Sequence, residues 1–220
     1  MQNTNSLRDE VLLQHQKLKG QPLSKKAEYF WHYYKTQTII VILVLCMLGN
    51  VFYSMATRKE TVLSIACINA SPDIETDILA YNFENYLGIN SKKQQVVIDS
   101  TYYINVDSVD TYSQKFQTNV MAGVLDVVLA DEANFDFYSK QGLFQDLTNI
   151  LSKKDLENYQ ENLYYADIPY DDSTQQVPVG IRISSTDNIG YPNSNAYLGI
   201  LTGTEHTDTA LSYLHYLENI

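Results

Sequence analysis

Four polar residues directly follow two apolar, strand-like runs of the chain, and they are the first candidates for chemistry. Asn69 and Ser71 come after the first run, and Asp131 and Glu132 come after the second. If both runs are parallel strands, these side chains lie at the carboxyl edge of one sheet, where open α/β sheets bind their ligands. The competing interpretation is that Ser71, Asp131 and Glu132 only cap the helices that follow. We therefore treat all four as candidate ligand-binding residues.

Arg182 is a fifth candidate, because a guanidinium can hold a carboxylate through two parallel hydrogen bonds. It is the only arginine beyond Arg58, which lies close to a long apolar segment. Two interpretations are open: the guanidinium pairs with an acidic residue of the fold, or it reaches the carboxylate of a ligand. Pairing within the fold is the default interpretation.

The four histidines do not predict an active site. His15 and His32 precede the apolar segment, whereas His206 and His215 lie near the end of the sequence. The last two are not at the i, i+4 spacing of a helical metal pair. The sequence also lacks the glycine-rich strings of phosphate-binding and dinucleotide-binding loops and the GxSxG of a nucleophile elbow. We predict surface or capping roles for His206 and His215, and no enzyme, metal or cofactor.

An acidic cluster of Asp167, Asp171 and Asp172 lies around Pro169. It lacks the alternating oxygen ligands and the terminal glutamate of an EF-hand calcium loop. We interpret it as a solvated turn.

The two cysteines, Cys46 and Cys67, form no Cys-x-x-Cys motif. Cys46 lies in the long apolar segment and Cys67 lies in a strand-like run, so one lies in lipid and the other outside it if the segment spans a membrane. We predict no disulfide between them and a buried structural role for Cys67.

The apolar segment from Thr38 to Ala56 contains 19 residues without a charge. A helix needs about 20 residues to cross about 30 Å of hydrocarbon, so the segment is long enough to span a bilayer. A cleaved signal peptide is the alternative, since Ser54 and Ala56 offer small side chains to a signal peptidase. However, the run is longer than the roughly 7 to 15 residues of a signal-peptide core. We predict a retained transmembrane helix over residues 38–57.

Charge is distributed unequally along the chain. Residues 1–59 carry eight Lys or Arg against three acids, whereas residues 60–220 carry seven against 23. By the positive-inside rule, residues 1–37 form a basic cytoplasmic tail with a juxtamembrane helix. Residues 60–220 then form an acidic domain on the outer side of the cell membrane, and its charge disfavours nucleic-acid binding.

Beyond Lys59, short apolar runs alternate with amphipathic stretches, which is the pattern of an α/β domain. Because helices separate the first strands, the connections imply right-handed parallel crossovers. We therefore expect an open, mainly parallel sheet with flanking helices. The predicted elements are strands at 61–68, 95–103, 125–130, 177–183 and 197–201, and helices at 71–87, 107–122, 153–163 and 206–214.

Two stretches carry the most distinctive motifs of the chain. The first runs from Met121 to Asp131 as MAGVLDVVLAD and continues to the GLFQDL of residues 142–147. The second combines the YLGIL of residues 197–201 with the helix predicted over residues 206–214. Both stretches resemble bacterial extracellular solute-binding proteins. The resemblance covers about residues 61–220 and implies one lobe of the periplasmic-binding-protein fold.

Complete members of that family close two lobes on a ligand, and this chain is too short for both. Only 45 residues separate Leu151 from Tyr197, so the second lobe is reduced to a loop and a strand. The family's ligand contacts therefore do not carry over, and a small-molecule ligand stays uncertain. The resemblance implies a membrane partner such as an ABC permease.

The sequence thus predicts a membrane-tethered, non-enzymatic extracytoplasmic module that binds or assists a partner. The alternative is a structural or assembly protein that holds a membrane complex together without any small ligand.

Overall fold

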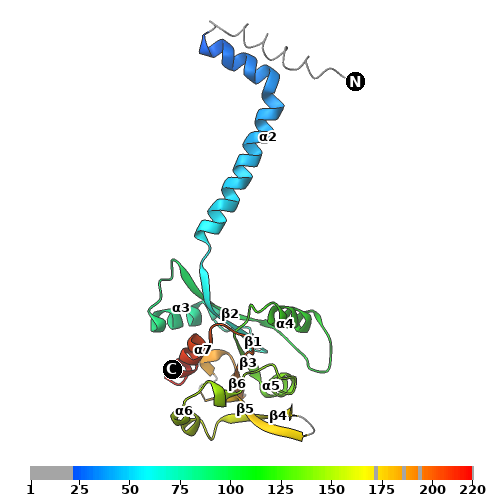
Figure 1. Ribbon diagram of the computed structural model, residues 1–220, viewed down its shortest axis with the longest axis vertical. Helices are drawn as coiled ribbons and strands as arrows, with labels where there is room; N and C mark the ends of the chain where they lie inside the picture. The colour runs from blue at the N-terminus through cyan, green and yellow to red at the C-terminus, as the bar shows by residue number, and fades with distance from the viewer. Residues whose placement is uncertain (1–21, 171–172, 185–186, 193–194, 220) are drawn as a thin grey trace. The chain divides into compact units, whose positions relative to one another are not determined.

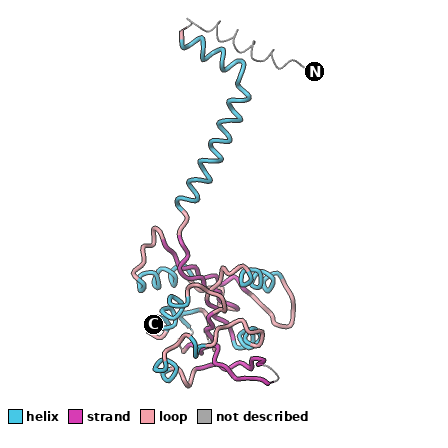
Figure 2. The backbone as a smooth tube through the Cα atoms, viewed as in Figure 1, coloured by secondary structure: helices cyan, strands magenta, loops and turns pink. Residues whose placement is uncertain are grey.

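The computed structural model describes residues 22–170, 173–184, 187–192 and 195–219 (Figure 1). The chain divides into two compact units, Met1–Arg58 and Lys59–Ile220. The described part of the first unit is helical, and the strands all belong to the second unit (Figure 2).

The helix of the first unit is α2 (Leu23–Thr57), which contains 35 residues. Its stretch Lys35–Met55 is long and apolar enough to cross a membrane, with a mean hydropathy of 2.2. A signal sequence near the N-terminus has the same properties, so length and composition alone fit both. The predicted juxtamembrane helix and the predicted span form one continuous helix, and the tail before Pro22 lies outside the described residues.

The second unit is an α/β domain built on a six-stranded sheet with the order β2-β1-β3-β6-β5-β4. The strands are β1 (Glu60–Ile68), β2 (Gln94–Tyr102), β3 (Val127–Asp131), β4 (Leu163–Tyr170), β5 (Ser173–Ile183) and β6 (Ala196–Ile200). The helices are α3 (Thr76–Leu87), α4 (Thr111–Met121), α5 (Glu132–Ser139), α6 (Lys153–Asn158) and α7 (Thr207–Leu217), with short 3-10 turns η1 (Leu147–Asn149) and η2 (Asp187–Ile189).

The sheet is mixed. β1 pairs in parallel with β2 and β3, whereas the pairs β3–β6, β6–β5 and β5–β4 are antiparallel. The prediction of a mainly parallel sheet is therefore wrong. The reason lies in the connections, because β4 and β5 follow each other as a hairpin without the crossover helix that parallel neighbours need.

Helices cover both faces of the sheet (Figure 1). On one face, α3 and α7 meet through Phe83 and Tyr213, whose ring centroids are 4.9 Å apart. On the other face, α4 and α5 meet through Phe116 and Tyr138, at 4.8 Å. A sheet buried on both faces has apolar central strands, so polar groups collect where those strands begin and end.

The helices α3 and α4 begin later than predicted. Turn residues after Ser71 delay α3 to Thr76, and α4 begins at Thr111 behind a capping box formed by Asp110 and Ser113. Both helices end at the predicted glycines, which have a φ of 65° at Gly88 and at Gly123. That left-handed conformation is one that glycine adopts without the steric cost of a Cβ.

The region between α6 and β5 differs most from the prediction. The helix α6 ends at Asn158, before the predicted end at Leu163. The predicted solvated turn around Pro169 belongs in part to the outer strand β4, in which Asp167 pairs with Gln176 and Pro169 with Thr174. Asp171 and Asp172 lie outside the described residues. A proline is tolerated in β4 because this strand is at the edge of the sheet, where a missing N–H need not break a ladder.

Cys67 generates a testable prediction, because it lies in β1 and is only 1% exposed, as the sequence predicted. Burial raises the pKa of its thiol to about 12, and the charge of Asp99 adds to the rise. Since the thiolate is the reactive form, we expect folded Cys46→Ser protein to react with a maleimide at least a hundredfold more slowly than denatured protein. The labelling rate in detergent, with and without guanidinium, measures this ratio. Equal rates would show that Cys67 is accessible.

Candidate functional site

The candidate site lies where β1 and β3 end, side by side in the sheet. After β1 the chain leads to α3 on one face, and after β3 it leads to α5 on the other face. Such a change of direction between neighbouring parallel strands forms a crevice at which α/β proteins bind ligands. Asn69 and Asp131 therefore meet at a topological switch point, as predicted from their positions after the two strands.

Asn69 is in direct contact with Asp131, since its Nδ2 donates to Asp131 Oδ2 at 2.8 Å. The same amide pairs with the backbone of Ile104: Nδ2 donates to the carbonyl oxygen at 2.9 Å, and Oδ1 accepts from the N–H at 2.8 Å. Asn69 has a φ of 57°, a left-handed conformation that asparagine adopts more readily than most residues. Its side chain is thus engaged by the fold itself.

Asp131 is the N-cap of α5, and its Oδ1 accepts from the backbone N–H of Asn134 at 3.0 Å. Its Oδ2 accepts from Asn134 Nδ2 at 2.9 Å. Asn134 is 2% exposed, and its own Oδ1 lacks a partner among the described residues. Glu132 is exposed in the first turn of α5, where a negative charge favours the helix dipole. The capping interpretation therefore holds for Asp131.

Tyr191 lies at the switch point, and no local pattern in the sequence indicates it. Its hydroxyl lies 2.8 Å from the carbonyl oxygen of Ile68 and 2.8 Å from that of Leu129, near the ends of β1 and β3. The residue is 2% exposed, and burial raises the pKa of the phenol well above its usual value. The hydroxyl therefore stays neutral and can act as a donor to these backbone carbonyls.

Ser71 belongs to a separate pocket beside this crevice. Its backbone N–H donates to the carbonyl oxygen of Gly190 at 2.6 Å, which joins the start of the α3 segment to the segment that carries Tyr191. The pocket has a volume of about 300 Å³ and includes the acids Asp73 and Glu75. Both acids precede α3, so stabilisation of the helix N-terminus is a sufficient account of their charge.

Arg182 lies apart from the other candidates, in β5. Its Nη2 and Nε donate to Asn162 Oδ1 at 3.0 and 3.3 Å. Among the described residues, Arg182 has this amide as its partner and forms no ion pair with a carboxylate. The default interpretation, that Arg182 pairs with an acidic residue of the fold, therefore has no support from the described residues. It borders a second pocket of about 160 Å³.

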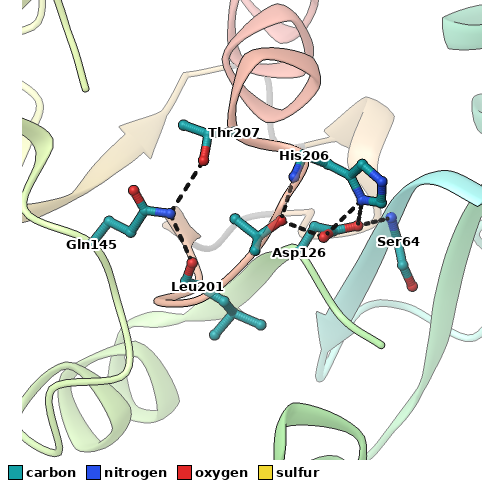
Figure 3. A network of polar contacts seen from close by, with 7 residues as sticks. Ser64, Asp126, Gln145, Leu201, His206 and Thr207 are labelled. Carbon is teal, nitrogen blue, oxygen red and sulfur yellow. Dashed lines mark hydrogen bonds and ion pairs between the residues drawn. The ribbon is translucent and has the colours of Figure 1, made fainter. Parts of the chain in front are cut away.

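A buried carboxylate, Asp126, organises the opposite end of β3 (Figure 3). Its Oδ2 accepts from the backbone N–H of Ser64 at 2.8 Å, and its Oδ1 accepts from the Thr204 hydroxyl. His206 Nδ1 lies 3.1 Å from Oδ1 and 3.2 Å from Oδ2. Asp126 is 5% exposed, and a buried carboxylate needs such partners because desolvation would otherwise be costly.

The sequence predicts a surface or capping role for His206, which occupies the N-cap position of α7 but makes no side-chain capping hydrogen bond there. The side chain is 38% exposed, but its Nδ1 faces Asp126. Within the described contacts, no hydroxyl or thiol meets Nε2, and the Thr204 hydroxyl donates to the carboxylate instead of the imidazole. The arrangement therefore fastens the loop between β6 and α7 to β1 and β3. The sequence contains one signal for this buried network, namely the carboxylate of Asp126 within the apolar run LDVVLA.

Metal binding has no support in the part of the chain that the structure describes, where no three His, Cys, Asp or Glu residues are grouped to hold an ion. The cysteine nearest to the switch point, Cys67, is buried in the core.

The role of Tyr191 can be tested by Tyr191→Phe, which removes the hydroxyl and leaves the ring. The carbonyl oxygens of Ile68 and Leu129 then lose their contact with a buried hydroxyl, so we expect the free energy of unfolding to fall by about 1 to 3 kcal/mol. Urea titration of the variant measures the change. Tyr81→Phe, at a tyrosine that is 60% exposed, is the matched control and should stay within about 0.5 kcal/mol of the unchanged protein. Equal stability of both variants would show that the Tyr191 hydroxyl does not hold the crevice.

Comparisons with known proteins add no relative. Neither a protein-family model, nor a curated protein, nor a solved structure matches this chain.

Proposed function

We propose that this chain is a single-pass protein of the cell membrane whose second unit is a non-enzymatic, extracytoplasmic accessory module that acts on a membrane partner. The observation that carries the proposal is the Tyr191 hydroxyl between the carbonyls of Ile68 and Leu129. It occupies the place where an α/β domain of this topology would take a small ligand. A domain with a filled crevice works through its surface.

The membrane tether is supported by the first unit. Lys35–Met55 has the length and hydropathy of a span, and the excess of basic residues before it favours a cytoplasmic N-terminus. The domain that follows would then face the outside of the cell, with 23 acids against seven basic residues.

Resemblance to one lobe of an ABC-transporter solute-binding protein is the second part of the proposal. The succession β1, α3, β2, α4, β3, α5 supports it, as does β6, which returns beside β3 as an antiparallel neighbour. The region between Leu151 and Tyr197 adds only α6, the hairpin β4–β5 and η2 to the described structure. The absence of room for a second lobe favours an accessory role, with a permease-like membrane protein as the partner class.

A contact surface for such a partner is available at the end of α4. Met121 is 89% exposed and Val124 is 53% exposed, and they lie on either side of the glycine that ends the helix. These two side chains are the apolar position that we select for testing contact with a partner.

The topology is tested by introducing one exposed cysteine at a time into a Cys46→Ser chain, in which the native Cys67 is buried and does not react. We expect a membrane-impermeant maleimide to label Ser152→Cys on intact cells, and to label Ser24→Cys only after the cells are permeabilised. Labelling of Ser24→Cys on intact cells would reverse the orientation. Release of the domain into the medium, with a new N-terminus after the apolar segment, would identify a cleaved signal sequence.

The accessory role is tested by placing a photo-crosslinking amino acid at position 121 in cells. We expect a discrete adduct with an integral membrane protein, because Met121 is apolar and almost fully exposed. The same crosslinker in place of exposed Lys153, in α6, is the control and should give no such adduct. Equal patterns at both positions contradict a specific contact. If a sugar or peptide raises the melting temperature of the protein and Asn69→Ala removes that increase, the result would instead support binding of a solute at the switch point.

A further inference from the structure

A second pocket lies away from the switch point, between the end of β5 and the helix α7. Its volume is about 160 Å³, and Tyr159 and Asn162 are among the residues that line it. Ile181, Leu214 and Leu217 line it and also belong to the apolar core, so the pocket has an apolar wall. Pockets for drug-sized ligands have volumes of about 300 to 1,000 Å³, so an occupant of this one has only a few heavy atoms.

One charge at this pocket is the guanidinium of Arg182. The turn before β4 holds the residue twice, because Asn162 accepts the backbone N–H of Arg182 at 2.8 Å and its side-chain oxygen accepts from Nη2 and Nε. A guanidinium has five N–H donors, and here only one neutral oxygen takes two of them. The remaining donors have no acceptor among the described residues. They form a positioned fork of the kind that binds a carboxylate.

The other charge is the carboxylate of Glu218, just after α7. Its Oε2 accepts from the Tyr159 hydroxyl at 2.7 Å, and His215 Nδ1 lies 3.9 Å from the same oxygen. Burial, followed by the hydrogen bond to Glu218, raises the pKa of Tyr159, so the phenol remains a donor that holds the carboxylate in place. The second oxygen of Glu218 accepts no hydrogen bond from a described residue.

Arg182 and Glu218 border the same small pocket, yet each is held by other residues and they form no ion pair with each other. Opposite charges held apart across an apolar wall are complementary to a molecule that carries both charges itself. We propose that this pocket binds a small zwitterion of the α-amino acid type, with its carboxylate on Arg182 and its ammonium group on Glu218. This function goes beyond the accessory role proposed above and does not depend on it.

The geometry makes a discriminating prediction about probes. L-alanine and L-valine carry both charges, whereas propionate and propylamine each carry one. A zwitterion gains both charge-assisted contacts, while a single-charge analogue leaves one charge of the pocket unmatched. We expect the two amino acids to bind at least tenfold more tightly than either analogue.

The experiment uses the full chain in detergent micelles, with leucine methyl groups and arginine Nε–H groups labelled for NMR. Titration with the four probes should move the methyl signals of Leu214 and Leu217 and the Nε–H signal of Arg182, which Arg182→Gln identifies by its loss. Empty micelles with the same probes correct for partitioning of propylamine into detergent.

Two variants and two matched controls decide the outcome. Arg182→Gln and Glu218→Gln should each weaken L-valine binding at least tenfold, the second while keeping an oxygen for the Tyr159 hydroxyl. Lys154→Gln and Glu157→Gln make the same changes of charge on exposed positions of α6 and should leave the affinity unchanged. Equal binding of propionate and L-alanine, equal losses in the controls, or no shift with any probe would each overturn the zwitterion site. None of these results bears on the membrane topology or on crosslinking at position 121.

Discussion

The Tyr191 hydroxyl contacts the carbonyl oxygens of Ile68 and Leu129, which belong to two neighbouring strands whose chains leave on opposite faces of the sheet. In a ligand-binding α/β domain, water or a ligand can meet such groups. Here one phenol from a distant part of the chain meets both. This tyrosine and the hydrogen bond from Ser71 to Gly190 join the segment 187–192 to the ends of β1 and β3.

Asp126 has a comparable role at the other end of β3. The carboxylate is buried, and donors from β1 and from the loop before α7 surround it. Tyr191 and Asp126 therefore fix the two ends of the central strands through polar contacts, while the apolar side chains of both faces fill the space between. Removing one donor from such a network leaves a buried polar group unmatched, which costs more than the hydrogen bond itself contributes.

Much of the parallel half of the sheet could be predicted, because its signals are local. Apolar runs, amphipathic stretches and the two helix-ending glycines lie next to the elements that they define, and the shared edge of Asn69 and Asp131 follows from strand direction alone. The hairpin β4–β5 could not be predicted in the same way, since Pro169 and the nearby acids have the composition of a turn. Only the position of β4 at the sheet edge makes them acceptable in a strand. The contacts of Tyr191 and of His206 join residues more than 60 positions apart, so no local pattern carries them.

The proline in the outer strand also affects how copies of the domain behave beside one another. An edge strand presents unpaired N–H and C=O groups, and these are a template for another strand. Pro169 lacks an N–H, so β4 has one backbone donor fewer than a strand without proline. Proline on an edge strand is one of the features that disfavour sheet-to-sheet polymerisation between copies of a domain.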